Sequence, residues 1–193
     1  MSVVVLGSAS PRRRELLRRL LSDFEVIPSA VEECLADGPL VDAVARLAEE
    51  KARAVAAAHP GAVVLGADTI VVIDDEPLGK PADASVARAM LQRLRGRPHD
   101  VLTGVAVVAG ARVFTGTEVT RVLMARYSDE LIARYVASGA PLDKAGAYAI
   151  QDLDGALVES IVGSYTNVVG LPLELTARLL TAAGVSVSVP VSS

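Results

Sequence analysis

The chain has 193 residues, of which 51% are hydrophobic and 22% charged, and this composition excludes an intrinsically disordered protein. Its formal net charge of −4 argues against a general nucleic-acid coat and against a polybasic membrane binder. The single cysteine, Cys34, excludes an intrachain disulfide, and with only two histidines it also excludes the usual four-ligand Cys/His zinc site. A metal, if the protein uses one, should be a hard cation held by carboxylate and phosphate oxygens.

The N-terminal residues lack the basic start and the long apolar run of a signal peptide, and no apolar run approaches the roughly 18 residues of a membrane span. We therefore expect a soluble, cytoplasmic protein. Its length predicts one domain over residues 1–193, or two closely packed halves, and we expect neither a nucleic-acid nor a membrane partner.

Strands and helices alternate in the first part of the chain. In order, the pattern predicts a strand at Val3 to Leu6, a helix from Pro11 to about Leu21, a strand at Phe24 to Ile27, a helix at Pro39 to Ala58, a strand region at Ala62 to Ile73 and a turn at Asp74 to Pro77. Ser10 is a good N-cap for the first helix, and Pro11 suits its first position. We expect the segment from Gly66 to Thr69 to interrupt the strand region.

In the second part of the chain, the pattern predicts a β-hairpin flanked by helices. In order, we expect a helix from Asp83 to about Arg95, strands at Val101 to Val108 and Arg112 to Met124, a helix from Ser128 to Ser138, an irregular stretch from Ala140 to Gly155, a strand at Leu157 to Val162, a helix between Pro172 and Gly184, and an edge strand or loose end at Val185 to Ser193. This order predicts an α/β fold with a mixed sheet.

The loop between the first predicted strand and helix has the composition of an anion site. Free backbone N–H groups and the helix dipole both favour a phosphate there, and Ser8 adds a hydroxyl. Arg12 and Arg13 fall in the first helical turn, where the dipole repels cations, so a bound anion would explain them. The alternative is a solvated basic helix face. The loop is not a P-loop, because the required glycine and lysine spacing is absent.

Carboxylates occur at two places where they could act in catalysis or bind a cation. Asp68 lies between apolar runs, where an ionised group is costly unless it is paired, bound to a metal or at a strand end. Its alternative is a turn residue after Gly66. Glu32 and Glu33 follow a predicted strand, where a carboxylate can hold a divalent cation; taken alone, they are a solvated pair.

Lysine is scarce in this chain, with three residues against 16 arginines, and so are glutamine and asparagine. Lys80 lies between two prolines and beside a glycine, and a stiff loop that presents one lysine indicates a phosphate contact. Lys51 lies on a predicted helix, where an exposed lysine is the simpler interpretation. Of the six Lys, Gln and Asn residues, five lie in segments that could line a cleft: Lys51, Lys80, Lys144, Gln151 and Asn167.

Taken together, these segments resemble the Maf family of nucleoside triphosphate pyrophosphatases, and the resemblance covers nearly the whole chain. The matching segments, in the family's order, are Leu6 to Leu17, Glu32-Glu33, Glu50 to Ala52, Gly66 to Thr69, Leu78 to Pro81, Thr103-Gly104, Asp143 to Tyr148 with Gln151, Gly163 to Tyr165 and Val168 to Pro172. The set is specific, although no single segment is.

The resemblance implies an α/β fold with a mixed twisted sheet, flanking helices and two lobes around a deep cleft, like that of the inosine triphosphate pyrophosphatases. It implies hydrolysis of a nucleoside triphosphate to the monophosphate and pyrophosphate with a divalent cation, Mg²⁺ or Mn²⁺. It also implies Asp68 as the proton acceptor and Glu33 as a metal contact. The residues that it implies for triphosphate binding are Ser8, Arg12, Arg13, Lys51 and Lys80.

A subgroup of the family that prefers dTTP and UTP is similar to this chain at Arg12, Thr69 and Gln151. The family also suggests a homodimer, with a role in cell division arrest or in removing non-canonical nucleotides. Two alternatives stay open: an inosine/xanthosine triphosphate pyrophosphatase, and a nucleotide-sensing division regulator that binds without turnover. The charged residues implied for the site argue against a non-catalytic regulator, because nucleotide binding alone does not need Asp68.

Overall fold

The computed structural model describes residues 3–188, which divide into two compact units. The first unit takes residues 3–68, Thr103–Glu118 and residues 170–188, and the second takes Thr69–Leu102 and Val119–Val169. The prediction of one domain over residues 1–193 stays a prediction. Residues 1–2 and 189–193 lie outside the described part of the chain, and so does the end of the predicted C-terminal strand or loose end.

A mixed sheet of seven strands is formed by the described residues, and this confirms the predicted α/β class. Its order is β2-β1-β3-β5-β6-β7, with β4 paired to β3. The strands are β1 (Val4–Leu6), β2 (Glu25–Val26), β3 (Val63–Ile73), β4 (Glu76–Leu78), β5 (Pro98–Ala109), β6 (Arg112–Met124) and β7 (Val158–Val162). The pairs of β1 with β2 and β3 are parallel, whereas β4 with β3 and β7 with β6 are antiparallel. The predicted cleft between two lobes stays a prediction.

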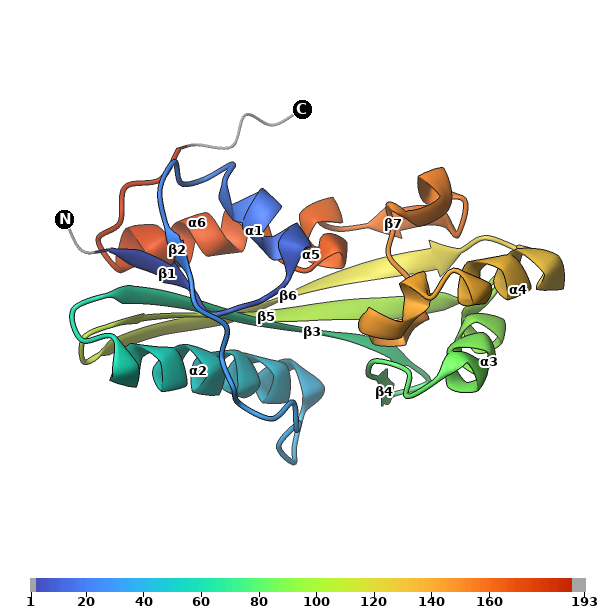
Figure 1. The fold of residues 1–193 in the computed structure, drawn as a ribbon, viewed down its shortest axis with the longest axis horizontal. Coiled ribbons are helices and arrows are strands. Elements are labelled where there is room, and N and C mark those ends of the chain that lie inside the picture. The colour runs from blue at the N-terminus through green and yellow to red at the C-terminus, as the bar shows by residue number, and fades with distance from the viewer. Residues whose placement is uncertain (1–2, 189–193) are drawn as a thin grey trace. The chain divides into compact units, whose positions relative to one another are not determined.

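Three helices pack on the strands of the first unit: α1 (Pro11–Leu17), α2 (Leu40–Ala58) and α6 (Leu173–Ala182). Figure 1 shows α2 on one face of these strands and α1 with α6 on the other. The apolar positions of α2 recur at helical spacing, so Ala48, Ala52 and Val55 all face the sheet and pack with Val5 and Val64. The predicted helix to about Leu21 ends earlier, at Leu17, although Leu20 and Leu21 are still buried.

Two strand glycines set how closely α2 lies on the sheet. A Cβ atom at Gly66 of β3 would lie 2.4 Å from the carbonyl oxygen of Ala48, and one at Gly104 of β5 would lie 2.3 Å from that of Val44. Both distances are too short for a real side chain, so the helix backbone rests where only glycine leaves room. The predicted interruption from Gly66 to Thr69 is therefore wrong: β3 runs unbroken, and Gly66 serves helix packing rather than a turn.

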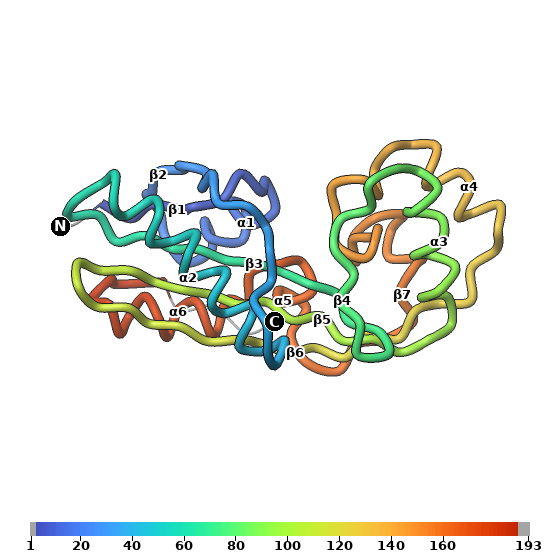
Figure 2. Tube along the Cα trace, turned by 90° about the horizontal axis from the view of Figure 1, so that it is seen from below, coloured from blue at the N-terminus to red at the C-terminus, as the bar shows by residue number. Residues whose placement is uncertain are grey.

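The second unit contains α3 (Ala84–Leu94), α4 (Asp129–Ala137) and the short α5 (Tyr165–Val169). The predicted caps are confirmed, because Asp83 accepts a hydrogen bond from the Val86 N–H at 2.9 Å and Ser128 accepts one from the Leu131 N–H at 3.2 Å. Figure 2 shows α3 beside α4, and their buried faces share one hydrophobic core. The predicted irregular stretch holds three short 3-10 turns, Ala140–Asp143, Ala145–Ala147 and Asp152–Gly155. Among residues 3–188, no helix has both the length and the apolar character needed to cross a membrane.

Candidate active site

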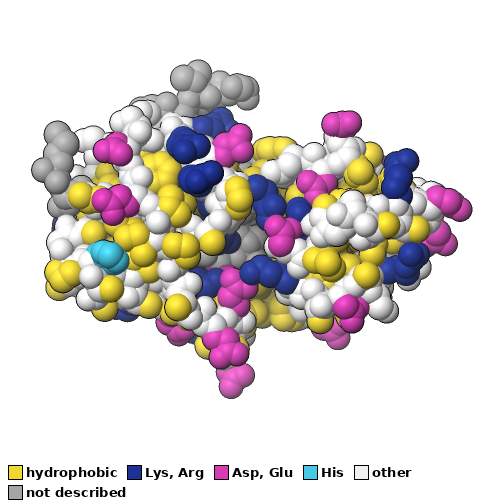
Figure 3. All heavy atoms as spheres, in the orientation of Figure 1, with side chains coloured by type: hydrophobic (Ala, Val, Ile, Leu, Met, Phe, Trp, Pro, Cys, Tyr) yellow, Lys and Arg dark blue, Asp and Glu magenta, His cyan; other side chains and the backbone are white. Residues whose placement is uncertain are grey.

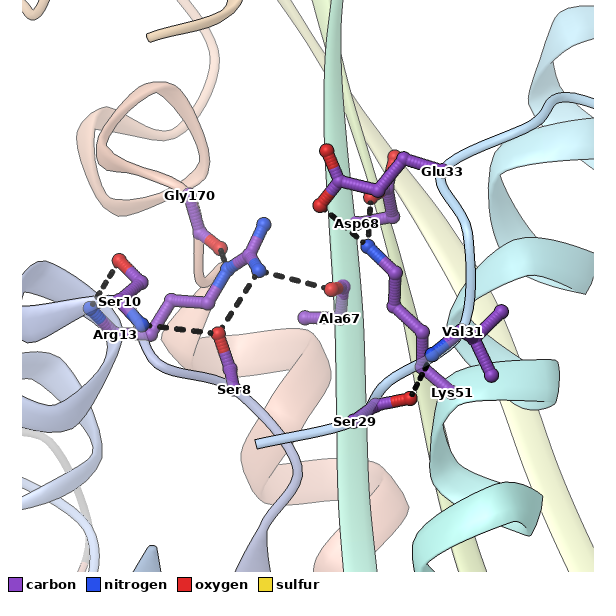
Figure 4. Close-up of polar contacts among 10 residues, drawn as sticks. All are labelled: Ser8, Ser10, Arg13, Ser29, Val31, Glu33, Lys51, Ala67, Asp68 and Gly170. Carbon is purple, nitrogen blue, oxygen red and sulfur yellow. Dashed lines mark hydrogen bonds and ion pairs between the residues drawn. The ribbon is translucent and has the colours of Figure 1, made fainter. Parts of the chain in front are cut away.

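A buried lysine joins two carboxylates in the first unit (Figure 4). Its Nζ atom, on Lys51, lies 2.6 Å from Asp68 Oδ1 and 2.9 Å from Glu33 Oε1. The side chains of Lys51 and Asp68 are 7% and 9% exposed, whereas that of Glu33 is 48% exposed. Two negative charges therefore surround one positive charge, and the side that faces solvent is a carboxylate.

Helical and strand periodicity explain why Lys51 meets Asp68. Lys51 lies three residues after Ala48 and four before Val55, so it shares the face of α2 that packs on the sheet. Asp68 lies two residues after Gly66 in β3, and alternate strand residues point to the same face. Because Gly66 lets α2 approach closely, the lysine reaches the carboxylate. The simpler interpretations, an exposed helix lysine and an aspartate in a turn, are both wrong.

Arg13 ties the first loop to the strand that carries Asp68. Its Nε atom donates to the Gly170 carbonyl oxygen at 2.8 Å, and its Nη1 atom donates to the Ala67 carbonyl oxygen at 2.9 Å and to Ser8 Oγ at 3.2 Å. Ser10 caps the helix by accepting a hydrogen bond from the Arg13 N–H at 3.4 Å. The predicted anion loop is thus held in a defined shape immediately beside Asp68.

The charges around this loop bear on how it would meet an anion. Burial of the guanidinium lowers the pKa of Arg13 from its ordinary value, while the carboxylates of Asp68 and Glu33 act in the opposite direction. Arg12 is partly exposed and forms no ion pair within the described chain, residues 3–188. On the face seen in Figure 3, Lys and Arg side chains gather over α1. Of the two arginines, Arg13 is therefore the one that the loop's own contacts engage.

The remaining predicted site residues, Thr69, Lys80 and Gln151, belong to the second unit. Thr69 directly follows Asp68 in β3 and is partly exposed, and Lys80 is exposed in the loop after β4. That loop is tied to the segment preceding Gln151, because the Gly146 N–H donates to the Gly79 carbonyl oxygen at 3.1 Å. Gln151 is exposed and lines a pocket of about 430 Å³.

The carboxylates of the first unit suit a divalent cation of the Mg²⁺ type. Such an ion is commonly bound through one or two carboxylates together with water and the oxygens of a phosphate substrate. Glu33 and Asp68 supply two carboxylates with hard oxygen donors, and both carboxylates contact the ammonium group of Lys51. No group of three or more His, Cys, Asp or Glu side chains able to enclose a metal occurs among residues 3–188. The donor set therefore fits a cation shared with a substrate rather than a closed protein cage.

The structure assigns Asn167 and Lys144 to internal contacts of the second unit. Asn167 is fully buried, and its Nδ2 atom donates to the Val101 carbonyl oxygen at 3.0 Å and to Thr120 Oγ1 at 2.9 Å. Lys144 is also buried, with Nζ 2.7 Å from Asp143 Oδ1. Of the two roles open to these residues from the sequence, shaping a loop is the one that these contacts favour.

Several groups that build the site were missed from the sequence. The carbonyl oxygens of Ala67 and Gly170 orient Arg13, and no residue type in the sequence marks a backbone acceptor. Gly66 and Gly104 did carry a signal, since glycine inside an apolar strand often marks a close backbone approach.

The chain is similar in sequence to a known family and to several curated proteins. The family model described as "Maf-like protein" matches residues 3–183. Three curated relatives, each named dTTP/UTP pyrophosphatase, come from Symbiobacterium thermophilum (53% identical over 186 residues, 95% of this chain and 95% of the relative), Myxococcus xanthus (53% over 184 residues, 95% and 93%) and Thermomicrobium roseum (52% over 189 residues, 97% and 87%). A solved protein from Vibrio cholerae is 15% identical and has a TM-score of 0.34, with 72% of this chain and 68% of that chain covered, too distant to carry an argument.

Proposed function

The chain belongs to the Maf family, and from this premise we propose that it hydrolyses nucleoside triphosphates, dTTP and UTP first among them, to the nucleoside monophosphate and pyrophosphate. The observation that carries the proposal is the buried Asp68 carboxylate, held at 2.6 Å by Lys51. The names of the relatives, at about half identity over nearly the whole chain, support the choice of nucleotide.

Asp68 is proposed to orient a water molecule and to accept its proton. A general base works when it is held within hydrogen-bond reach of the proton that it takes. The rigid placement of Asp68 supports this role, because its strand and the α2 helix bearing Lys51 are both regular elements packed on one core. The water oxygen attacks the α-phosphorus, the proton passes to Asp68, and the bond to the bridging oxygen breaks. Pyrophosphate leaves, and the nucleoside monophosphate remains.

Cationic side chains are proposed to neutralise the triphosphate, which carries about four negative charges near neutral pH. Phosphoryl transfer depends mainly on positioning and on charge stabilisation. Arg12 and Lys80 would supply positive charge and Ser8 a hydroxyl. Lys51 stays a predicted triphosphate ligand, but its ion pairs with Asp68 and Glu33 favour a role in holding those carboxylates. Arg13 stays a predicted triphosphate ligand, but its bonds to Ala67 and Gly170 favour a role in holding the loop.

A divalent cation, Mg²⁺ or Mn²⁺, is proposed to bind at Glu33. When bound, such an ion polarises phosphate oxygens and stabilises the charge that develops on them. Glu33 suits this role because its side chain is about half exposed and lies beside the buried Lys51–Asp68 pair. Its carboxylate can therefore meet an ion that arrives from solvent with the substrate.

Gln151 is proposed to read the base. Its amide both donates and accepts hydrogen bonds, as does the edge of thymine or uracil, and the adjoining pocket of about 430 Å³ has room for a pyrimidine ring. A site that depends on such bonds can reject other bases strongly. Arg12 and Thr69 remain the other two proposed contributors to substrate preference.

A pyrophosphate-release screen over canonical nucleotides, ITP and XTP, with and without Mg²⁺ or Mn²⁺, tests the function. We expect dTTP and UTP to give the highest kcat/KM, and Asp68→Asn to lower kcat by about 10²- to 10⁴-fold. Asp23→Asn, which removes an exposed carboxylate of the same unit, is the matched control and should keep full activity. Preference for ITP or XTP would support the inosine/xanthosine alternative, nucleotide binding without turnover would support the regulator, and equal rates with GTP and dTTP would contradict the pyrimidine assignment.

Two further properties are proposed: a cytoplasmic location and a homodimeric state. Light scattering coupled to size-exclusion chromatography checks the second, and a mass of about twice 20.0 kDa is the expected result. A mass near that of one chain at micromolar concentration would contradict it.

A further inference from the structure

A buried polar chain in the second unit ends beside Gln151. Lys144 is 8% exposed, and its Nζ atom contacts the Ala140 carbonyl oxygen, Asp143 Oδ1 at 2.7 Å and Asp152 Oδ2 at 3.6 Å. The hydroxyl of Tyr135, a residue 2% exposed, donates to the same Asp152 Oδ2 atom at 2.5 Å. Asp152 is the residue directly after Gln151. The carboxylate next to the proposed base-reading residue is therefore anchored from two sides.

We propose that Tyr135, Lys144 and Asp152 are positioning residues that fix the place of Gln151 and thereby set the discrimination between nucleobases. The proposal rests on the pyrimidine triphosphatase function proposed above, and it adds to that function the residues that hold the reading side chain. None of the three needs to touch the nucleotide. Their effect passes through the backbone of the 151–155 segment.

The backbone after the anchor shows that this segment needs to be held. Leu153 and Asp154 have φ angles of 52° and 53°, and Gly155 follows at 80°. Left-handed backbone is disfavoured for side chains such as leucine, so successive residues of this kind persist only where the surroundings impose them. Asp152 supplies one restraint through Tyr135 and Lys144, and Leu153 supplies another by packing against the core of the unit.

The pocket beside the segment shows what the anchor would control. Gln151, Asp154 and Gly155 line it together with Ile150, Ile161 and Tyr165. Gln151 and two of the left-handed residues, Asp154 and Gly155, thus line the same pocket. If the anchor loosens, the backbone that carries Gln151 can shift and its amide with it, whereas the apolar part of the wall stays in place. We therefore expect loss of base selectivity rather than loss of the hydrolytic step.

Tyr135→Phe is the direct test, because it deletes one hydroxyl and leaves the ring. We expect the ratio of kcat/KM for dTTP to that for GTP to fall about fivefold, the value of one ordinary hydrogen bond, mainly through a higher KM for dTTP. Tyr127→Phe is the matched control: its buried hydroxyl donates at 2.8 Å to the Leu91 carbonyl oxygen in the same core and should leave the ratio unchanged. Thermal melting of both variants measures any general loosening.

Asp152 gives a second, independent pair of variants. Asp152→Ala removes the acceptor and should lower the dTTP/GTP ratio of kcat/KM more than Tyr135→Phe does. Asp152→Asn keeps an oxygen that can accept from the Tyr135 hydroxyl, so its ratio should lie between those of Asp152→Ala and the wild type. The positioning role would be overturned if the ratio in Tyr135→Phe and Asp152→Ala stayed within twofold of the wild-type ratio. It would also be overturned if the ratio fell as far in Tyr127→Phe as in Tyr135→Phe. Failure of the proposed function would look different, since wild-type protein itself would then show no preference for dTTP over GTP.

Discussion

Each unit buries a pair of polar side chains, and the two pairs differ in charge. The first keeps a charged pair, Lys51 with Asp68, between a long helix and a long strand. The second keeps a neutral pair, in which His99 Nε2 lies 2.7 Å from the Tyr148 hydroxyl. Burial lowers the pKa of His99 to about 4 and raises that of the Tyr148 hydroxyl, so both groups are uncharged at neutral pH. A buried charge is costly, and this chain retains the pair where the proposed chemistry needs an ionised carboxylate.

The backbone that carries the proposed functional residues also differs between the two units. Lys51 and Asp68 lie inside regular elements whose hydrogen bonds and packing fix their direction. Gln151, by contrast, precedes a short 3-10 turn with left-handed residues and depends on the Asp152 anchor. The comparison teaches that the group proposed for proton transfer sits on rigid framework, while the group proposed for recognition sits on a loop held by side-chain contacts.

Breaking the charged pair on one side should have the largest effect on stability. Lys51→Met leaves Asp68 buried without its ammonium partner, and we expect the free energy of unfolding in urea to fall by about 3–5 kcal/mol. The double variant Lys51→Met/Asp68→Leu should recover most of this loss, because an apolar pair of similar size needs no charge compensation. Equal instability of the single and double variants would show that the pair is not what holds this region.

The neutral pair should make the protein sensitive to acid. Free histidine sites take up a proton near pH 6.5, whereas folded His99 does so only near pH 4, so the unfolded state binds more protons between these values. Stability should therefore fall as the pH drops from 7 to 4, with His99 contributing up to about 3 kcal/mol of the loss.

Urea unfolding at several pH values checks this contribution. His99→Gln should flatten the pH dependence, and substitution of the chain's other histidine, His59→Gln, should not. An unchanged slope in His99→Gln would mean that other groups cause the acid sensitivity.

The close approach of α2 to the sheet should have the smallest effect on stability but a selective effect on activity. Gly66→Ala places a methyl group against the backbone of Ala48 and Ala52, which lie three residues before and one residue after Lys51, and should cost about 1–3 kcal/mol. Gly104→Ala meets the backbone of Val44 instead, two turns from Lys51. We expect comparable melting temperatures for the two variants but a larger loss of kcat in Gly66→Ala. Equal kcat values would show that the position of α2 does not govern the Lys51–Asp68 geometry.

Much of the fold could be predicted from local patterns, and the failures have physical causes. The caps at Asp83 and Ser128 and the hairpin around Gly110 were correct because they depend on neighbours in the sequence. The break expected in β3 was wrong because Gly66 and Asp68 are each explained by α2, which precedes them in the chain but contacts them only after folding. The short helix α5 was not predicted, since Asn167 is held there by Val101 and Thr120, far away in sequence.

The candidate site shows the same division. Lys51 lay on the predicted apolar face of its helix, three residues from Ala48 and four from Val55, so its burial could have been read from the spacing. The role of Arg13 could not, because its acceptors are the backbone oxygens of Ala67 and Gly170. The anchoring of Asp152 by Tyr135 was equally invisible, since it joins α4 to a turn 17 residues later.

From the sequence alone follow the order of the elements and the α/β class, because these depend on local periodicity and on residue type. The family follows from motifs that occur in its order along the chain, and the residues proposed to meet a triphosphate stay a prediction. Only the folded chain decides that Lys51 neutralises Asp68, that Arg13 shapes the loop and that Lys144 supports the residue after Gln151. The reason is that an ion pair or a backbone hydrogen bond requires two groups at about 3 Å, and packing between distant segments sets that distance.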